Sequence, residues 1–359
     1  MKPAFFAINL MLIVSAIDCT KNPVAPPPPS PNRSDTTSHN YSFQIFSFGG
    51  GGGSILNDVT IINDTLVYAV GQIYFTDSTG QYDPQTYGFG QWDGSKWSFQ
   101  KVAYHDFGIT QLFPGELNSI LAFGANDIFV SSPASLLHWD GSSWTEKAFF
   151  MTSLPFNGQV TKMWGTSDFN IYCVGWGGAI YHYDGNSWMK LESGTTLPIH
   201  DIWGAQNFQT GQLEILAVAS DDVNKKLLKI QGTTVSTVPD SGLSASLYGV
   251  WFVPEEKYYV VGAGIGYKSS LDNSPWSVYP SGAVTSYMSG GVRGSGLNNV
   301  FVAGSFFEIV HYNGSTWHTY KDVIPFTDGA VGSMAVNGDI MVTVGLSGQN
   351  AVAIIGKRE

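Results

Sequence analysis

One stretch of the chain reads Trp164-Gly165, then Ile171-Tyr172-Cys173-Val174-Gly175, then His182-Tyr183-Asp184-Gly185, then Ser187-Trp188. Its closing part returns as Trp-Asp-Gly-Ser-Lys-Trp at 92–97, Trp-Asp-Gly-Ser-Ser-Trp at 139–144 and Tyr-Asn-Gly-Ser-Thr-Trp at 312–317. The acidic residues of successive copies, Asp93, Asp140 and Asp184, are 47 and 44 residues apart. This is the period of a four-stranded propeller blade, so the repeat predicts an all-β propeller.

The spacing inside the repeat allows the blades to be counted. A glycine or another small residue closes the second strand of each unit, and a marked position in the first strand lies eleven residues earlier. In one unit the two positions, Trp203 and Ala219, are sixteen residues apart, which indicates a loop insertion at 208–212. The marked positions predict seven blades: Thr60, Leu121, Trp164, Trp203, Trp251, Arg293 and Met334.

The two ends of the array complement one another. The seventh unit stops after its third strand, at 351–355, and lacks the final Ser-Trp strand. Asn40-Tyr41-Ser42-Phe43-Gln44 matches Lys96-Trp97-Ser98-Phe99-Gln100 at the end of the first blade. We therefore expect the N-terminal strand to complete the last blade and close the ring, which leaves no long open edge. The glycine run at 49–53 would link this strand to the first blade.

The repeated turn has a mechanical explanation. Asp-Gly or Asn-Gly between apolar residues is a strong hairpin signal, and it predicts a type I′ turn with two positive φ angles. The tryptophan after each turn supplies a large apolar body, which we expect to lie between neighbouring blades.

Composition limits the partners. Net charge is −11, 13% of residues are charged and 14% are aromatic. The chain has three arginines and no basic run, so it offers nothing to bind a nucleic-acid backbone or an anionic membrane surface. We read the acidity as a contribution to solubility.

The N-terminus predicts export. Met1-Lys2 and the apolar stretch 4–17 form a signal-peptide pattern that is too short to span a bilayer. Cys19 resembles the acylated cysteine of bacterial lipoproteins, although Asp18 stands where those proteins carry Gly, Ala or Ser. Cleavage after Ala16, giving a soluble periplasmic or secreted protein, remains the alternative. We assign 1–18 to the signal peptide, 19–39 to a Pro-rich tether and 40–359 to the propeller.

Two resemblances follow from these motifs. If Cys19 is acylated, the lipoprotein pattern with Thr20 implies the outer membrane, and the lipid would be the chain's only membrane contact. The units Trp-Gly…Val-Gly…His-Tyr-Asp-Gly…Ser-Trp resemble the repeats of secreted bacterial seven-bladed β-propellers over about 40–357, and many of those proteins are lipoproteins of unknown role.

A shorter segment has a resemblance of its own. The stretch Ser-Leu-Asp-Asn-Ser-Pro-Trp at 270–276 resembles, one residue short, the Asp-box of sialidases and photosystem-assembly-type propellers, where the box is a structural turn. A sialidase needs three arginines around its substrate, and only Arg293 lies within a blade here, which excludes that activity.

No metal or cofactor is expected. Three histidines, His138, His182 and His311, occupy one equivalent place on three different blades and cannot converge on one ion. The glycines at 262–266 precede no helix and predict a turn rather than a dinucleotide loop. We expect Cys173, in an apolar run, to be a buried small hydrophobe. It could pair with Cys19 only if Cys19 is not acylated.

Arg293 is the candidate ligand-binding residue. It stands where Trp164, Trp203 and Trp251 stand in their blades, in the strand nearest the central channel. An arginine there could stack on or pair with a ligand, and the three tryptophans would line the same site. The alternative is an ion pair with an acidic residue of a neighbouring blade. The insertion at 73–90 is either a recognition loop or a neutral decoration.

Two functions remain. The first is a monomeric, non-catalytic, envelope-tethered scaffold that binds a protein or assembles a complex. The second is a carbohydrate-binding or carbohydrate-active propeller. The repeated tryptophans lie within strand patterns rather than on loops, which favours the scaffold.

Overall fold

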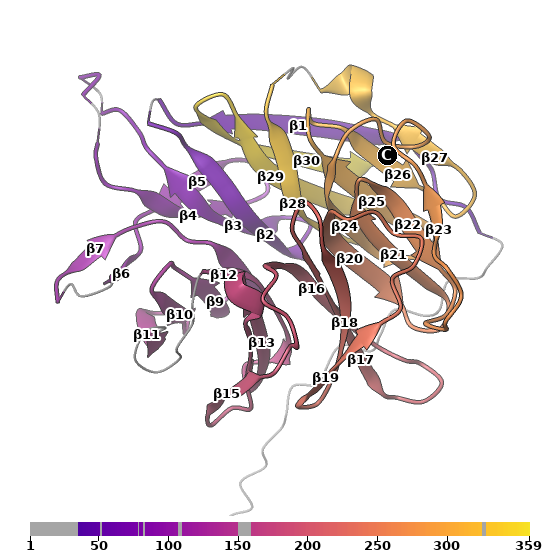
Figure 1. The fold of residues 1–359 in the computed structure, drawn as a ribbon. Helices are drawn as coiled ribbons and strands as arrows, with labels where there is room; N and C mark the ends of the chain where they lie inside the picture. Colours follow the sequence, from indigo (N-terminus) through magenta and orange to yellow (C-terminus); the bar gives the residue numbers. More distant parts are fainter. Residues whose placement is uncertain are drawn as a thin grey trace, which may run out of the picture. The chain divides into compact units, whose positions relative to one another are not determined.

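The computed structural model describes residues 35–50, 52–77, 79–81, 83–106, 110–149, 159–324 and 328–359 (Figure 1). All of them belong to one compact unit, residues 31–359. The predicted signal peptide and Cys19 lie outside the described residues. Within the described part, no helix has the length and apolar character that a membrane crossing requires.

The described residues of this unit form seven four-stranded antiparallel sheets and one two-stranded sheet. The first three blades are β2 (Ile55–Asn63), β3 (Leu66–Ile73), β4 (Tyr87–Trp92) and β5 (Trp97–Gln100); β8 (Ser119–Gly124), β9 (Asp127–Ser131), β10 (Ser135–Trp139) and β11 (Trp144–Phe149); and β12 (Val160–Ser167), β13 (Asn170–Gly175), β14 (Ile180–Tyr183) and β15 (Trp188–Leu191).

The next three are β16 (Ile199–Gln206), β17 (Leu213–Ser220), β18 (Lys225–Gln231) and β19 (Thr234–Val238); β20 (Leu247–Val253), β21 (Lys257–Gly262), β22 (Gly264–Lys268) and β23 (Ser277–Tyr279); and β24 (Ser289–Gly296), β25 (Asn299–Gly304), β26 (Ile309–Tyr312) and β27 (Trp317–Thr319). The seventh combines β28 (Ala330–Asn337), β29 (Ile340–Ser347) and β30 (Asn350–Arg358) with β1 (Tyr41–Phe48).

The sheets form a closed ring. The first strand of each blade packs against the first strands of its two neighbours, from β2 against β8 round to β28 against β2. Because neighbours cover both faces of each sheet, second strands such as β17 are apolar and buried along nearly their whole length. Outer strands such as β5 alternate between half-buried and exposed residues. The predicted seven-bladed, all-β propeller is confirmed.

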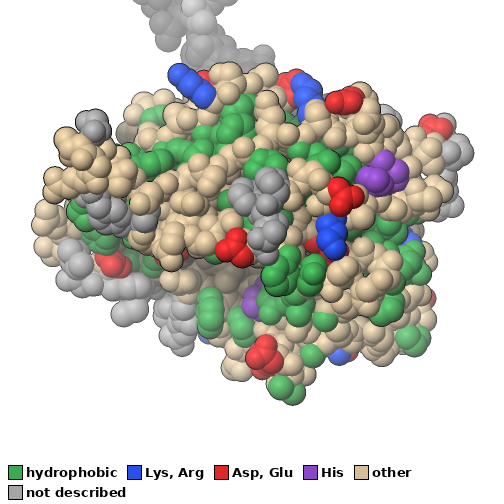
Figure 2. Space-filling view, turned by 90° about the horizontal axis from the view of Figure 1, so that it is seen from above, with side chains coloured by type: hydrophobic (Ala, Val, Ile, Leu, Met, Phe, Trp, Pro, Cys, Tyr) green, Lys and Arg blue, Asp and Glu red, His purple; other side chains and the backbone are tan. Residues whose placement is uncertain are grey.

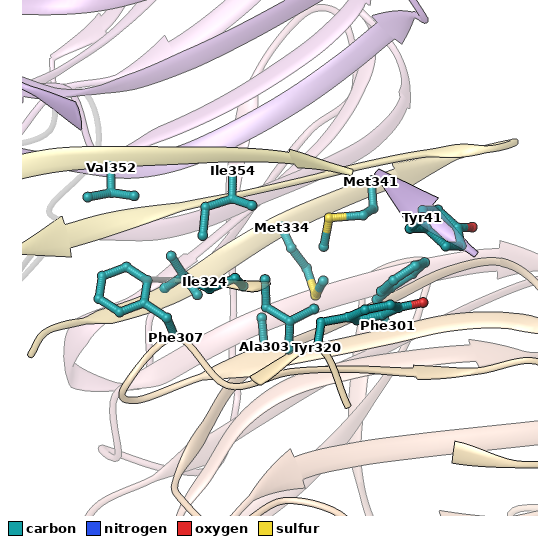
Figure 3. Packing of buried hydrophobic residues seen from close by; sticks show 12 residues of the cluster. Tyr41, Phe301, Ala303, Phe307, Tyr320, Ile324, Met334, Met341, Val352 and Ile354 are labelled. Atoms are coloured by element: carbon teal, nitrogen blue, oxygen red, sulfur yellow. The ribbon is translucent and has the colours of Figure 1, made fainter. Parts of the chain in front are cut away.

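The N-terminal strand closes the ring as expected. β1 pairs antiparallel with β30 over its full length, from Tyr41 opposite Arg358 to Phe48 opposite Ala351. Figure 1 shows indigo β1 beside yellow β30. The core between the sixth and seventh blades includes Tyr41, Phe301 and Tyr320, and Figure 3 shows Tyr41 at one end of it.

The predicted turn type is wrong. In the four repeated turns only the glycine has a positive φ, near +90°, as at Gly94 (+92°) and Gly185 (+92°). One positive φ at the first central position is the pattern of a type II′ turn. The preceding carboxylate replaces backbone acceptors, since Asp93 Oδ1 accepts the N–H groups of Ser95 and Lys96 at 2.9 Å each.

The tryptophans that follow the turns lie between blades, as expected. Trp97 packs against Phe46 and Phe48 of the seventh blade, and Trp188 belongs to the core shared by the second and third blades. An additional hairpin that the repeat did not predict, β6 (Ala103–His105) with β7 (Leu112–Pro114), lies in the connection between the first two blades.

Candidate functional site

The first strands share a local distortion at one end of the central channel. Six of them shift register at the same place, so that one residue bulges out of the ladder. Such bulges are common where a sheet must re-aim side chains. The bulged residues line a cavity of about 140 Å³ at the channel mouth: Asn57, Thr161, His200, Tyr248, Gly290 and Gly332.

The residue that follows each bulge lines the interior of the channel. In four blades it is polar: Asp58, Lys162, Asp201 and Ser333. The Asp58 carboxylate accepts hydrogen bonds from Ser119 Oγ at 2.8 Å, Ser333 Oγ at 2.5 Å and the Ile120 N–H at 3.0 Å, and it pairs with the Lys162 ammonium.

These contacts determine the charge of the buried acid. Burial of Asp58 tends to raise the pKa of its carboxyl, but Lys162 and the hydrogen bonds outweigh burial and lower it below its ordinary value. Asp58 therefore carries its charge in the folded protein, and the pair closes one side of the channel.

Arg293 closes the other side. It is 6% exposed, and its guanidinium makes a bidentate pair with Asp201, with N···O distances of 2.7 and 2.8 Å. Its Cζ also lies 5.0 Å from the centroid of the Trp203 ring. Burial opposes the charge, but Asp201 raises the pKa of Arg293 above its ordinary value. Asp201 belongs to the fourth blade, two blades away from Arg293 in the sixth. The sequence suggests an ion pair as the alternative to ligand binding, but with an acidic residue of a neighbouring blade.

The polar pairs divide the channel. Beyond them lies a second cavity of about 230 Å³, lined mainly by apolar residues and including Trp164, Trp203 and Arg293. Trp251 is 3% exposed and packs in the core between the fifth and sixth blades. The structure thus brings Arg293 together with two of the three proposed tryptophans. Ligand binding by these residues stays a prediction.

One marked position was assigned incorrectly. Arg293 pairs with Phe301, three residues before Gly304, but the residue opposite Val342, three before Gly345, is Ala335. Ala335, not Met334, is therefore equivalent to Arg293, because β28 lacks the second register shift that β24 has between Gly294 and Gly296. The polar groups of the channel could have been found in the sequence. They lie two residues before the corrected marked position of their blade, where a polar residue interrupts an otherwise apolar strand.

The repeated histidines each have a partner in their own blade. The Nε2 atoms of His138, His182 and His311 lie 2.8, 2.8 and 3.0 Å from a side-chain oxygen of Asp127, Asn170 and Asn299. Each imidazole also stacks on the aromatic residue opposite it in the second strand. Among the described residues no set of three or more His, Cys, Asp or Glu side chains is arranged to hold a metal.

Other predicted features lie as follows. Cys173 is buried in β13, and burial raises the pKa of its thiol. The insertion after β3 is held to the first blade by an ion pair between Asp83 and Lys101 at 2.8 Å. All eleven tryptophans are described, and of these only Trp176, 55% exposed, is an exposed one.

Exposed apolar side chains gather on one face. Each blade has two ends, which lie on opposite faces of the ring. We call the top face the one that carries the connections between blades and the turns between second and third strands. The bottom face carries the turns between first and second strands and between third and fourth strands. Charged groups in Figure 2 lie singly or in pairs rather than in a block of one sign. Among the described residues, seven large exposed hydrophobic side chains lie in top-face connections: Leu112, Trp176, Val223, Tyr287, Met288, Phe306 and Val323.

Two of these residues, Tyr287 and Phe306, form an exposed aromatic pair. The rings of Tyr287 and Phe306 are 4.5 Å apart, and Phe306 is 51% exposed. Phe306 and Phe307 have φ of +55° and +57°, a conformation that costs a bulky residue about 1–2 kcal/mol. The buried Glu308 carboxylate holds the adjoining loop by accepting the N–H groups of Ser286 and Tyr287 at 2.8 and 3.1 Å.

Comparison with known proteins supports the fold. No family model matches the sequence, and no curated protein matches it. The solved structure of YCF48 bound to D1 peptide is 15% identical with a TM-score of 0.64, covering 92% of this chain and 99% of that one.

Two other solved propellers are similar. YCF48 from Cyanidioschyzon merolae is 13% identical with a TM-score of 0.59, covering 88% of this chain and 98% of that one. The WD40 β-propeller domain of Doa1 is 14% identical with a TM-score of 0.58, covering 88% and 97%. At these identities the likeness shows a shared seven-bladed propeller fold and nothing about function.

Proposed function

We propose that this protein is a non-catalytic scaffold that binds a protein partner on its top face. The observation that carries the proposal is the pair Tyr287–Phe306, two exposed rings in contact, one of them held in an unfavourable backbone conformation. Strained residues persist where the surrounding structure enforces them, and they cluster at binding sites. Exposed aromatic residues anchor protein interfaces.

Two further observations support a protein partner over a small molecule or a sugar. The channel is divided by buried ion pairs, so it offers a small substrate little room along the axis. A lectin would present aromatic residues on every blade, whereas the exposed rings here are few and uneven. A similar propeller, YCF48, has been solved with a bound peptide.

The test is capture from an envelope lysate by the full chain carrying Cys19→Ser, which cannot be acylated. We expect partners that are retained by this chain and by Phe208→Ala on the bottom face, but lost with Tyr287→Ala/Phe306→Ala. A glycan array run in parallel with Arg293→Ala tests the carbohydrate alternative. Sugar binding that Arg293→Ala abolishes, with no variant-dependent protein capture, would overturn the scaffold function.

The tether forms the second part of the proposal. We infer that acylated Cys19 anchors the protein to the outer membrane, with the Pro-rich segment as spacer. Cell fractionation tests this: the wild-type chain should enter the membrane fraction and Cys19→Ser the soluble fraction. A wild-type chain found in the soluble fraction, like Cys19→Ser, would favour cleavage after Ala16.

A further inference from the structure

The protein binds one extended peptide segment of its own on the bottom face. Residues 35–40, which precede β1, leave the seventh blade and cross to the turns of the sixth. The Thr37 N–H donates to the Asn313 carbonyl at 3.1 Å, and Asn313 Nδ2 donates to the Thr37 carbonyl at 3.1 Å. Asn298 Nδ2 donates to the Asp35 carbonyl at 3.0 Å. The segment thus covers the groove between these blades.

A histidine at the base of this groove receives the segment. His311 Nε2 lies 3.0 Å from Asn299 Oδ1, so the ring nitrogen carries a hydrogen there and Nδ1 is an acceptor. His39 Nδ1 lies 2.9 Å from that acceptor and must donate to it. His39 Nε2 in turn lies 3.1 Å from Thr316 Oγ1.

The groove between the second and third blades has the same arrangement of positions, but carboxylates replace two of the amides, so it lacks the donor that Asn313 Nδ2 provides. Asn126, Asp127, His138 and Asp140 occupy the register positions of Asn298, Asn299, His311 and Asn313. His138 Nε2 lies 2.8 Å from the Asp127 carboxylate, and its ring lies 4.3 Å from that of Phe129, as His311 lies 4.4 Å from Phe301.

This second groove is open. It has a volume of about 380 Å³, and His138, Phe129, Lys147, Phe169 and Trp188 are among the residues that line it. Phe169 at its rim is 59% exposed. Among the described residues no group hydrogen-bonds to His138 Nδ1, the atom whose counterpart in His311 accepts from His39. Because His138 Nδ1 is itself buried, a ligand donor reaches it only after the side chains over it move aside.

The difference has a topological cause. In the seventh blade the third and fourth strands are not joined, so the chain before β1 is free to cross to the preceding blade. In the third blade a hairpin joins Tyr183 to Trp188, and within the described part of the chain no segment pairs with the turns of the second blade as residues 35–40 do with those of the sixth. In that part of the chain the receiving groups therefore have no segment bound to them.

We propose that the groove between the second and third blades binds an extended, largely uncharged segment of a partner protein, in the manner of residues 35–40. The segment places a hydrogen-bond donor opposite His138 Nδ1 and a ring against the groove's aromatic lining. This proposal rests on the protein-binding function and adds to it a second, bottom-face contact.

The probe is a fluorescein-labelled peptide with the sequence of residues 35–41, titrated into the full chain with polarisation as readout. We expect saturable binding that His138→Ala weakens about tenfold, the loss of one hydrogen bond with its ring contact. His182→Ala is the matched control, since it has the same register and the same contacts in its own blade. Phe169→Ala, an exposed rim change, should also weaken binding.

Location is tested by a photo-crosslinker in place of the histidine of the peptide. Adducts within 125–147 or 166–188 support the proposal. Adducts only within 295–320 would mean exchange at the groove already occupied, and would overturn it. No binding, or equal weakening by His138→Ala and His182→Ala, also overturns it. Lysate capture that depends on Tyr287 and Phe306 would still stand in either case, which separates this failure from that of the proposed function.

Discussion

At the residue scale, the repeated turn shows how a single side chain and a single glycine define the end of a blade. Asp184 Oδ1 accepts the N–H groups of Asn186 and Ser187 at 2.9 and 2.8 Å, which fixes the loop. Gly185 supplies the positive φ, and a Cβ there would lie 2.5 Å from Cβ of Phe169. The residue therefore faces both a backbone and a steric restriction.

We expect Gly185→Val to destabilise the third blade, because a β-branched residue resists φ of +92° and also meets Phe169. Gly194→Val is the matched control: its φ is +67°, but nothing lies within 4 Å of an added Cβ. Thermal unfolding should show a larger decrease in the free energy of unfolding for Gly185→Val than for Gly194→Val, and about 1–2 kcal/mol of that decrease comes from the backbone conformation alone. Equal decreases for the two variants would show that the close contact with Phe169 does not destabilise the blade.

At the scale of elements, the docking of residues 35–40 on the sixth blade depends on the charge state of the histidines. Burial lowers the pKa of His311 to about 3, with help from the nearby His39, Arg358 and His318, and burial also lowers the pKa of His39. Tyr41, Asn299 and Phe301 contact the same ring. Protonation of His311 would put a hydrogen on both facing Nδ1 atoms, so the segment docks best when the His311 ring is uncharged.

The sign of the pH effect follows from this pKa. The unfolded chain takes up a proton near pH 6.5 that the folded chain accepts only near pH 3, so stability falls as the pH drops below about 6.5. The expected slope approaches 1.4 kcal/mol per pH unit. Between pH 7.5 and 5, denaturant unfolding of His311→Phe should lose much of this slope, while the exposed His318→Gln, which removes only the smallest contribution to the lowered pKa, should retain most of it. Identical slopes in all three would contradict the assignment.

The elements also show what the sequence could predict. The number of blades, closure by the N-terminal strand and the inserted turn at 208–212 follow from a fixed spacing, and all are confirmed, whereas the hairpin β6–β7 was not predicted. The turn type was not predictable from Asp-Gly alone, because the aspartate side chain takes over hydrogen bonds that decide it.

The channel site was only partly predictable. Arg293 could be found because it breaks an aromatic position, but its partner Asp201 lies 92 residues earlier and two blades away. The open groove between the second and third blades could not be predicted from the sequence, because its residues are nearly the same as those of the groove between the sixth and seventh blades. What differs is the connectivity around them, and that becomes visible only when the blades are placed side by side.

At the scale of the whole molecule, stability depends on a ring whose last sheet is assembled from both ends of the propeller. β30 pairs with β29 on one side and with β1 on the other, and residues of β1 contribute to two inter-blade cores. Loss of β1 would leave β30 as an open edge and uncover both cores, so closure should control cooperativity and not only one blade.

We therefore expect deletion of residues 40–48 to abolish the single cooperative unfolding transition, while deletion of an equal length of the tether, residues 24–32, leaves it intact. A circular permutant gives the decisive contrast. Tyr41 lies opposite Arg358, and the Glu359 N–H donates to the Asn40 carbonyl at 3.0 Å, so an inserted Asn-Gly turn can join Glu359 to Asn40. This permutant, starting at Gly49, keeps β1 but lacks residues 35–39 and their contacts with the sixth blade, so it should regain a single cooperative transition at a melting temperature below that of the chain with residues 24–32 deleted. Cooperative unfolding of the 40–48 deletion, or failure of the permutant to recover it, would show that β1 does not close the ring.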